Sequence, residues 1–294
     1  MTVQDFLRQN TALLLEHGVQ TARLDCLVLL EDALNTNRTH LLAYPEEPIP
    51  DSTLAILTQN IQRRLQREPL AYIRGHAEFY GRTFAVDQHV LVPRPESEAL
   101  IDLLRQYAPP GHATIVDIGT GSGALAITAK YELAGAVVIA TDIDPACLAI
   151  AQVNAGKHHI PITFLAGSLL QAVPLSSLTP PLVLLCNLPY VPDGYAINED
   201  AAHEPKKALF AGKDGLDLYR KLFDQVAKLG TDETIIITEA LAEQHQALTK
   251  IAQSARCTLL ASEGLAQCFL YHRTRHTNGL AIERRSLGRY PARP

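Results

Sequence analysis

The chain has 294 residues, of which 47% are hydrophobic and 19% charged, an ordinary composition for a globular protein with one large core and a smaller domain. Its formal net charge of −5 argues against a broad electrostatic interaction with nucleic acid, and no apolar run is long enough to span a bilayer. The five cysteines form no Cys-x-x-Cys pair, which indicates free thiols, and the histidines lack metal-ligand spacing. We therefore expect a cytoplasmic protein without a membrane segment or a metal site.

Residues 1–70 are predicted to form helices. Apolar residues recur at helical spacing from Val3 to Leu14, and Asp51 is a candidate N-cap for a later helix. The far face of that helix is basic and is either a solvated surface or a docking surface for a macromolecular partner. Its arginines are Arg63, Arg64 and Arg67. Aromatic and β-branched residues around Gly81 then predict a β-hairpin within residues 71–92, linking two domains.

From residue 93 onward, helices and strands are predicted to alternate. A helix is predicted at 99–107, with Glu96 and Glu98 at its first turn, where the helix dipole favours carboxylates. Short apolar runs predict strands at 114–118, 137–140, 162–165, 182–186, 234–238, 258–260 and 268–272. Helices are expected at 124–132, 146–155, 218–228 and 243–254. This alternation predicts an α/β fold with a doubly wound, mainly parallel sheet. The arginine-rich tail from about residue 273 is expected to be solvated, with contact to RNA or another acidic surface as the alternative.

A glycine-rich loop, Gly119-Thr120-Gly121-Ser122-Gly123, follows the strand at 114–118. Glycines let the backbone turn tightly and approach a ligand closely. No Gly-Lys-Ser/Thr follows, which argues against a triphosphate-binding loop. Asp142 ends the next strand, where a carboxylate is suited to accept hydrogen bonds from ribose hydroxyls. These two features fit a dinucleotide and S-adenosylmethionine equally.

The stretch Asn187-Leu188-Pro189-Tyr190 follows the buried strand at 182–186 and suits a planar NH2 group. The side-chain oxygen of Asn187 can accept one N–H, and the backbone carbonyl of Leu188 can accept the other. Pro189 restricts Leu188 to extended conformations, and the ring of Tyr190 can stack on the plane. Such a site serves methyl transfer to an amide or amine nitrogen, whereas a dehydrogenase has no need of it. It therefore favours S-adenosylmethionine at the glycine loop.

The segments Asp117 to Gly123 and Asn187 to Tyr190 together resemble the class I S-adenosylmethionine-dependent N-methyltransferases. Three more stretches resemble the release-factor glutamine methyltransferase family, often called HemK or PrmC. They are Phe79-Tyr80-Gly81, Val90-Leu91-Val92-Pro93-Arg94-Pro95-Glu96-Ser97-Glu98, and Glu204-Pro205 with Ala208-Leu209 and Asp214-Gly215-Leu216-Asp217-Leu218-Tyr219. The resemblance implies a seven-stranded methyltransferase sheet in residues 93–294, a β-hairpin linker at 71–92, and a small helical substrate-docking domain at 1–70, in a monomer.

The family transfers a methyl group from S-adenosylmethionine to the side-chain amide nitrogen of the glutamine in the Gly-Gly-Gln motif of class I peptide chain release factors. Carried over to this sequence, the residues that contact the cofactor are Gly119, Thr120, Gly121, Ser122, Gly123, Asp142, Ser168, Leu169 and Asn187. Asn187 and the carbonyl of Leu188 would accept the two N–H groups of the substrate amide, while Pro189 and Tyr190 pack its side chain. No catalytic acid or base is expected.

Two positions depart from the family pattern. Leu188 stands where the family usually has proline, and Ser168-Leu169 stand where it commonly has an acidic residue and an aromatic or large apolar one. Ser168 is therefore expected to bond adenine as a neutral partner.

Three alternative functions remain open. They are methylation of a ribosomal-protein glutamine, methylation of adenine N6 in rRNA or DNA, and a catalytically silent cofactor-binding scaffold. An adenine methyltransferase would be expected to have a basic groove and to flip out a base, whereas only the tail of this chain is markedly basic.

Overall fold

The computed structural model describes residues 1–109, 111–231 and 233–273, which form two compact units. The first unit consists of Met1–Glu78, Thr83–Val92 and Ala196–Lys206. The second consists of Phe79–Arg82, Pro93–Tyr195 and the described residues from Lys207 onward. Beyond Arg273, the arginine-rich tail lies outside the described residues. Among the helices of the described residues, none is both long and apolar enough to cross a membrane.

The first unit is built around five helices, as the periodicity of residues 1–70 predicts. They are α1 (Val3–Glu16), α2 (Ala22–Leu34), α3 (Arg38–Ala43), α4 (Asp51–Leu65) and α5 (Leu70–Arg74). Their apolar faces meet in one core that includes Phe6, Leu30 and Leu57. The prediction that Asp51 is an N-cap was wrong by one residue: Pro50 occupies that position, and Asp51 lies in the first turn, where the helix dipole favours its charge.

The basic face predicted for α4 is only partly exposed. Arg64 is only 3% exposed, and its guanidinium donates to Asp25 Oδ2 and to Asp200 Oδ2, both at 2.7 Å. Arg67 donates to the other oxygen of Asp200 at 2.7 Å. Because a buried guanidinium needs carboxylate partners, Arg64 forms internal ion pairs and is not part of a solvated or docking face. The helical periodicity could not reveal partners that lie far away in the sequence.

The predicted hairpin is present but shorter than expected. Strands β1 (His76–Phe79) and β2 (Arg82–Ala85) are joined by Tyr80 and Gly81, which both have positive φ, as a tight two-residue hairpin turn requires. The segment around Val90 does not continue the strand. Val90 ends a turn in which its N–H donates to the Asp87 carbonyl, so the chain has already left the hairpin at this point.

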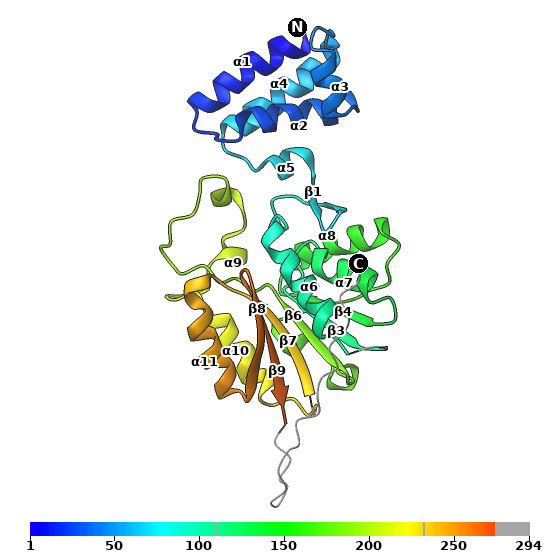
Figure 1. The fold of residues 1–294 in the computed structure, drawn as a ribbon, viewed down its shortest axis with the longest axis vertical. Coiled ribbons are helices and arrows are strands. Elements are labelled where there is room, and N and C mark those ends of the chain that lie inside the picture. The colour runs from blue at the N-terminus through cyan, green and yellow to red at the C-terminus, as the bar shows by residue number, and fades with distance from the viewer. Residues whose placement is uncertain (110, 232, 274–294) are drawn as a thin grey trace, which may run out of the picture. The chain divides into compact units, whose positions relative to one another are not determined.

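The second unit contains a seven-stranded sheet, which confirms the predicted doubly wound, mainly parallel architecture (Figure 1). Its strands are β3 (Thr114–Ile118), β4 (Val137–Asp142), β5 (Thr163–Ala166), β6 (Leu182–Cys186), β7 (Glu233–Glu239), β8 (Cys257–Glu263) and β9 (Ala266–His272). Their order is β5-β4-β3-β6-β7-β9-β8. The first five strands are parallel, and β9 runs antiparallel to both of its neighbours.

Helices cover both faces of this sheet. They are α6 (Glu98–Tyr107), α7 (Ala124–Glu132), α8 (Pro145–Lys157), α10 (Asp217–Val226) and α11 (His245–Ser254). The one-turn helix α9 (Lys206–Leu209) precedes α10 in the chain. Helices α6, α7 and α8 pack side by side, while α10 and α11 pack together (Figure 1). The central strands β3 and β6 are buried along their whole length, as their continuous apolar runs predict.

Candidate active site

The candidate site lies where the strand order reverses, between β3 and β6. Parallel α/β sheets bind ligands at the carboxyl ends of the strands at such a switch point. In the β3–β6 register Asp117 lies opposite Leu185, so the loop after β3 and the motif after β6 leave the sheet side by side. A Cβ atom on Gly119 would lie 3.3 Å from Leu188 Cδ2, so the two segments are in contact. The structure thus brings together the two motifs that the sequence singled out.

Hydrogen bonds with buried side chains fix the conformation of the glycine loop. Asp117 is fully buried, and its Oδ2 accepts hydrogen bonds from the Thr120 hydroxyl at 2.6 Å and the Ala126 N–H at 3.1 Å. The side-chain amide of Asn154 donates to the Ser122 carbonyl at 2.8 Å. Burial raises the pKa of Asp117 to about 7, opposed by the hydrogen bonds from Thr120 and Ala126. The loop therefore has a conformation fixed by the protein alone.

Asp142 lies against this loop at the end of β4. One carboxylate oxygen accepts the Gly121 N–H at 3.0 Å, and the other accepts the Asp144 N–H at 2.9 Å. The side chain is largely buried, yet a carboxylate has lone pairs for further donors. At Gly121 an added Cβ would meet nothing within 4 Å, so the loop faces open space beside this carboxylate.

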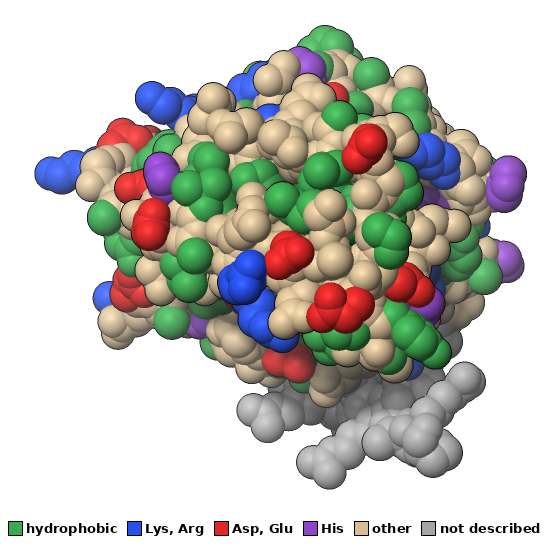
Figure 2. Space-filling view, turned by 90° about the horizontal axis from the view of Figure 1, so that it is seen from above, with side chains coloured by type: hydrophobic (Ala, Val, Ile, Leu, Met, Phe, Trp, Pro, Cys, Tyr) green, Lys and Arg blue, Asp and Glu red, His purple; other side chains and the backbone are tan. Residues whose placement is uncertain are grey.

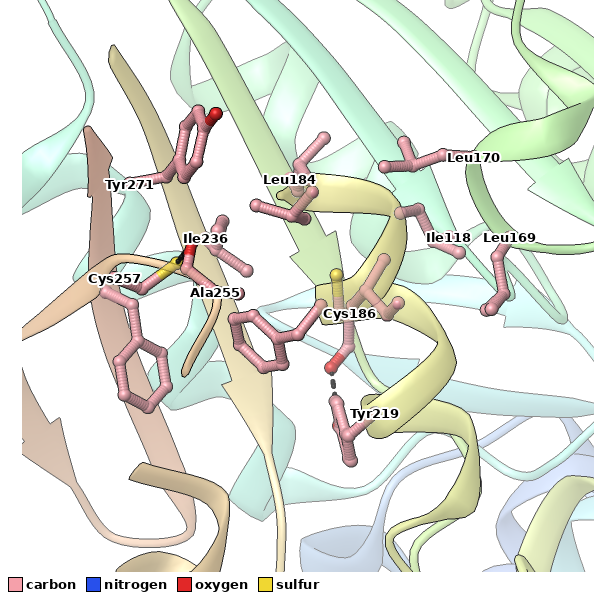
Figure 3. Close-up of a cluster of buried hydrophobic side chains, with 14 of the residues drawn as sticks. Ile118, Leu169, Leu170, Leu184, Cys186, Tyr219, Ile236, Ala255, Cys257 and Tyr271 are labelled. Carbon is pink, nitrogen blue, oxygen red and sulfur yellow. Dashed lines mark hydrogen bonds between the residues drawn. The ribbon is translucent and has the colours of Figure 1, made fainter. Parts of the chain in front are cut away.

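Ser168 and Leu169 follow β5, whose end is tied to the same region by a 2.9 Å hydrogen bond from the Gly167 N–H to the Asp142 carbonyl. Ser168 is half-buried, whereas Leu169 is 7% exposed and belongs to the core cluster drawn in Figure 3. Leu169 has φ +53, a conformation that is strained for a branched side chain and that often occurs near functional sites. Most of the Leu169 side chain is thus used in core packing.

Asn187 is half-buried and already has one hydrogen bond. Its Nδ2 donates to the hydroxyl oxygen of Ser97 at 2.8 Å. With the amide nitrogen paired in this way, the acceptor end of the side chain, Oδ1, remains for a ligand. Leu188 is 3% exposed and packs in the core, which accounts for its apolar side chain at a position where only the backbone carbonyl was expected to act.

Two contacts hold Tyr190. Its hydroxyl donates to Glu239 Oε1 at 2.9 Å, and its backbone carbonyl accepts from Gln244 Nε2 at 2.7 Å. Gly215 packs directly against that carbonyl, and a Cβ there would overlap the oxygen. Burial, together with the nearby Glu239 carboxyl, raises the pKa of Tyr190 well above its usual value. The ring is therefore fixed at both its hydroxyl and its backbone.

The ends of β6 and β7 are joined by Tyr219, a fully buried residue of α10. Its hydroxyl lies 2.9 Å from the Cys186 carbonyl oxygen (Figure 3). The carbonyl oxygen of Glu239 lies 2.5 Å from the same hydroxyl. Because Cys186 ends β6 and Glu239 ends β7, the Tyr219 hydroxyl holds the carboxyl ends of these two strands at a fixed distance.

Sequence reasoning missed four supporting residues: Ser97, Tyr219, Glu239 and Gln244. Ser97 and Tyr219 lie within the stretches that carry the family resemblance, although no role was predicted for them. Glu239 could have been found by the rule that pointed to Asp142, since it is a polar residue at the end of an apolar strand. Gln244 carries no local signal.

The sheet order, the glycine loop, the acidic residue after β4 and the Asn-x-Pro-Tyr stretch after β6 define a class I S-adenosylmethionine-dependent methyltransferase. The family model described as PrmC N-terminal domain matches residues 5–75, and the one described as Ribosomal protein L11 methyltransferase (PrmA) matches residues 97–186. The chain belongs to the release factor glutamine methyltransferase family, which confirms the resemblance noted in the sequence. The cofactor is S-adenosylmethionine.

The relatives that show the family match most of this chain. The release factor glutamine methyltransferase of Moorella thermoacetica is 36% identical over 283 residues, which cover 93% of this chain and 99% of that protein. The one of Deinococcus radiodurans is 37% identical over 234 residues, covering 77% of this chain and 81% of that protein. Among solved structures, a ribosomal protein L11 methylase from Lactobacillus delbrueckii subsp. bulgaricus has 18% identity and a TM-score of 0.44, over 62% of this chain and 81% of that chain.

Proposed function

We propose that this enzyme methylates the side-chain amide nitrogen of the glutamine in the Gly-Gly-Gln motif of class I peptide chain release factors. Membership of the release factor glutamine methyltransferase family supports the substrate class. The observation that carries the proposal is the orientation of Asn187 beside the glycine loop. Its amide nitrogen is bonded to Ser97, so its acceptor oxygen is available to an N–H donor such as a glutamine amide.

The cofactor residues in this proposal are Gly119 to Gly123, with Asp142 for the ribose hydroxyls and Ser168 and Leu169 for the adenine. The fit is supported by the open space at Gly121 and by the Asp142 carboxylate next to it. S-adenosylmethionine supplies a methyl group on a sulfonium centre. Asp117 and Asn154 keep the loop in one conformation, so little reorganisation is needed when it binds a ligand.

The chain activates the substrate by hydrogen bonding and orientation. An amide nitrogen is a weak nucleophile because its lone pair is delocalised into the carbonyl. Asn187 Oδ1 and the Leu188 carbonyl accept the two N–H groups, which returns electron density to nitrogen, and Pro189 and Tyr190 confine the side chain so that nitrogen faces the methyl donor. No general base is required, since the methylated amide loses its proton after transfer.

The surface charge supports a protein substrate over a nucleic acid. The formal net charge is −5, and on the face shown in Figure 2 acidic and basic side chains are interspersed with apolar ones. Nucleic-acid binding draws on a continuous basic surface that pairs with phosphates. The proposal includes docking of the release factor on the helices of residues 1–70 and a monomeric, cytoplasmic enzyme. The five unpaired, buried cysteines are in keeping with a reducing compartment.

The experiment is to incubate the protein with S-adenosylmethionine labelled in the methyl group and with a release factor, ribosomal proteins or rRNA in separate reactions. Mass spectrometry then locates the label. We expect it on the Gly-Gly-Gln glutamine, and none on a release factor in which that glutamine is replaced by glutamate. Label on ribosomal protein or adenine, with none on the release factor, would overturn the proposal.

A further inference from the structure

Two hydrogen bonds tie the candidate substrate-holding side chains to buried residues behind them. Asn187 donates to Ser97, and Tyr190 donates to Glu239. The other oxygen of the Glu239 carboxyl, Oε2, is buried and accepts no hydrogen bond from the described residues. Ser97 and Glu239 are 3% and 1% exposed, so neither side chain is placed to meet solvent.

The sheet register explains why these groups meet. In the parallel pair β6–β7, Cys186 lies opposite Thr238, so Asn187 and Glu239 directly follow this pair at the carboxyl ends of the two strands. Side chains opposite each other in a sheet project to the same face. Ser97 comes from the short turn that precedes α6, within the same compact unit.

We propose that Ser97 and Glu239 are positioning residues that set the orientation of Asn187 and Tyr190 for the substrate amide. The proposal rests on the proposed function, since it concerns the same N–H donors. An asparagine amide has one accepting end and one donating end. The hydroxyl oxygen of Ser97 accepts from the donating end, which leaves Oδ1 for the substrate. If the amide were flipped, Nδ2 would face the substrate N–H, and two donors would oppose each other.

Glu239 performs the same task for the aromatic ring. A buried carboxyl is costly unless hydrogen bonds satisfy it, and an apolar residue of similar volume would often be as stable. Burial and the nearby Glu96 raise the pKa of Glu239, while Ser97, Tyr190 and Arg94 lower it. Its hydrogen bond with the Tyr190 hydroxyl indicates a role in holding Tyr190 rather than in stability alone.

The test uses two matched pairs of variants in the full chain. Ser97→Ala removes the hydroxyl, whereas Ser97→Thr keeps it. Glu239→Leu removes the acceptor for Tyr190, whereas Glu239→Gln keeps one. For each variant, kcat with the release factor, the cofactor Kd by calorimetry and the unfolding midpoint are measured beside those of the wild type.

We expect kcat to fall roughly 10- to 100-fold in Ser97→Ala and Glu239→Leu, because small misplacements of this kind cost about that much. Cofactor Kd should stay within about threefold, and the conservative partners should recover most of the rate. Equal rates within either pair, or a parallel loss of cofactor affinity, would overturn the inference. A wild type that fails to methylate the release factor would instead contradict the proposed function.

Discussion

Gly215 offers a sharp test of how Tyr190 is held. It has φ +75, and a Cβ at this position would overlap the Tyr190 carbonyl oxygen and lie 2.5 Å from Gln244 Nε2. Real Cβ atoms do not occupy such positions, so Gly215→Ala must move the backbone on one side of the contact. Since Gln244 bonds both the Tyr190 and Asp214 carbonyls, the shift also breaks partly buried hydrogen bonds.

The loss of stability expected in Gly215→Ala is the sum of a conformational cost and a hydrogen-bond cost. A left-handed conformation costs a residue with a Cβ about 1–2 kcal/mol, and a buried carbonyl that loses its donor costs about 1–3 kcal/mol. Gly215→Ala should therefore reduce the free energy of unfolding by roughly 2–5 kcal/mol, at the upper end of single-residue effects. Methyl transfer should fall about tenfold or more, because Tyr190 is displaced, while cofactor binding is retained.

The matched control is Gly264→Ala in the turn between β8 and β9. Gly264 also has positive φ, +56, yet a Cβ there meets nothing within 4 Å, so this variant measures the conformational cost alone. Urea unfolding and steady-state turnover are compared for the two variants. If both lose the same stability and both keep full turnover, the account of Gly215 as a close-packed support for Tyr190 is wrong.

Three further predictions concern charged groups. Arg64→Met leaves Asp25 buried without its guanidinium and should reduce the free energy of unfolding by about 3–5 kcal/mol, measured in urea; a loss below about 1 kcal/mol would contradict this. Because burial raises the pKa of Asp117 to about 7, the folded protein keeps a proton that the unfolded chain has released, so this group makes stability fall as pH rises from about 4 to 7. In Asp117→Asn that contribution should be absent, so the variant should gain stability relative to the wild type as pH rises through this window. Urea unfolding at each pH measures this, and a difference in unfolding free energy that stays constant with pH would refute the assignment. Asp142→Asn keeps an acceptor for the Gly121 N–H but loses the charge, so calorimetry should show cofactor affinity reduced about 10- to 100-fold; unchanged affinity would exclude Asp142 from the ribose contact.

Much of the fold was predictable because local patterns determine it. The strand at 114–118, the helix at 124–132 and the strand at 182–186 end where their apolar runs end, and the structure gives the same bounds. The glycine loop and Asp142 were recognisable because polar residues and glycines directly follow these buried strands. Their convergence then depends only on parallel strands sharing one edge of the sheet.

The residues that were missed depend on partners distant in sequence. Ser97 meets Asn187 across 90 positions, and Arg64 meets Asp200 across 136. Neither pairing follows from the periodicity of one segment. The same limit explains the error over α4, whose arginines were predicted to share one solvated or docking face although Arg64 is buried.

The central claim is that Asn187 holds the substrate amide rather than the cofactor alone. Its most direct test is the turnover of Asn187→Ala on a release factor, measured together with the Kd for S-adenosylmethionine. We predict that methyl transfer is abolished while cofactor binding is partly retained, since Gly119 to Gly123 and Asp142 are unchanged. Near-normal turnover by Asn187→Ala would contradict the account.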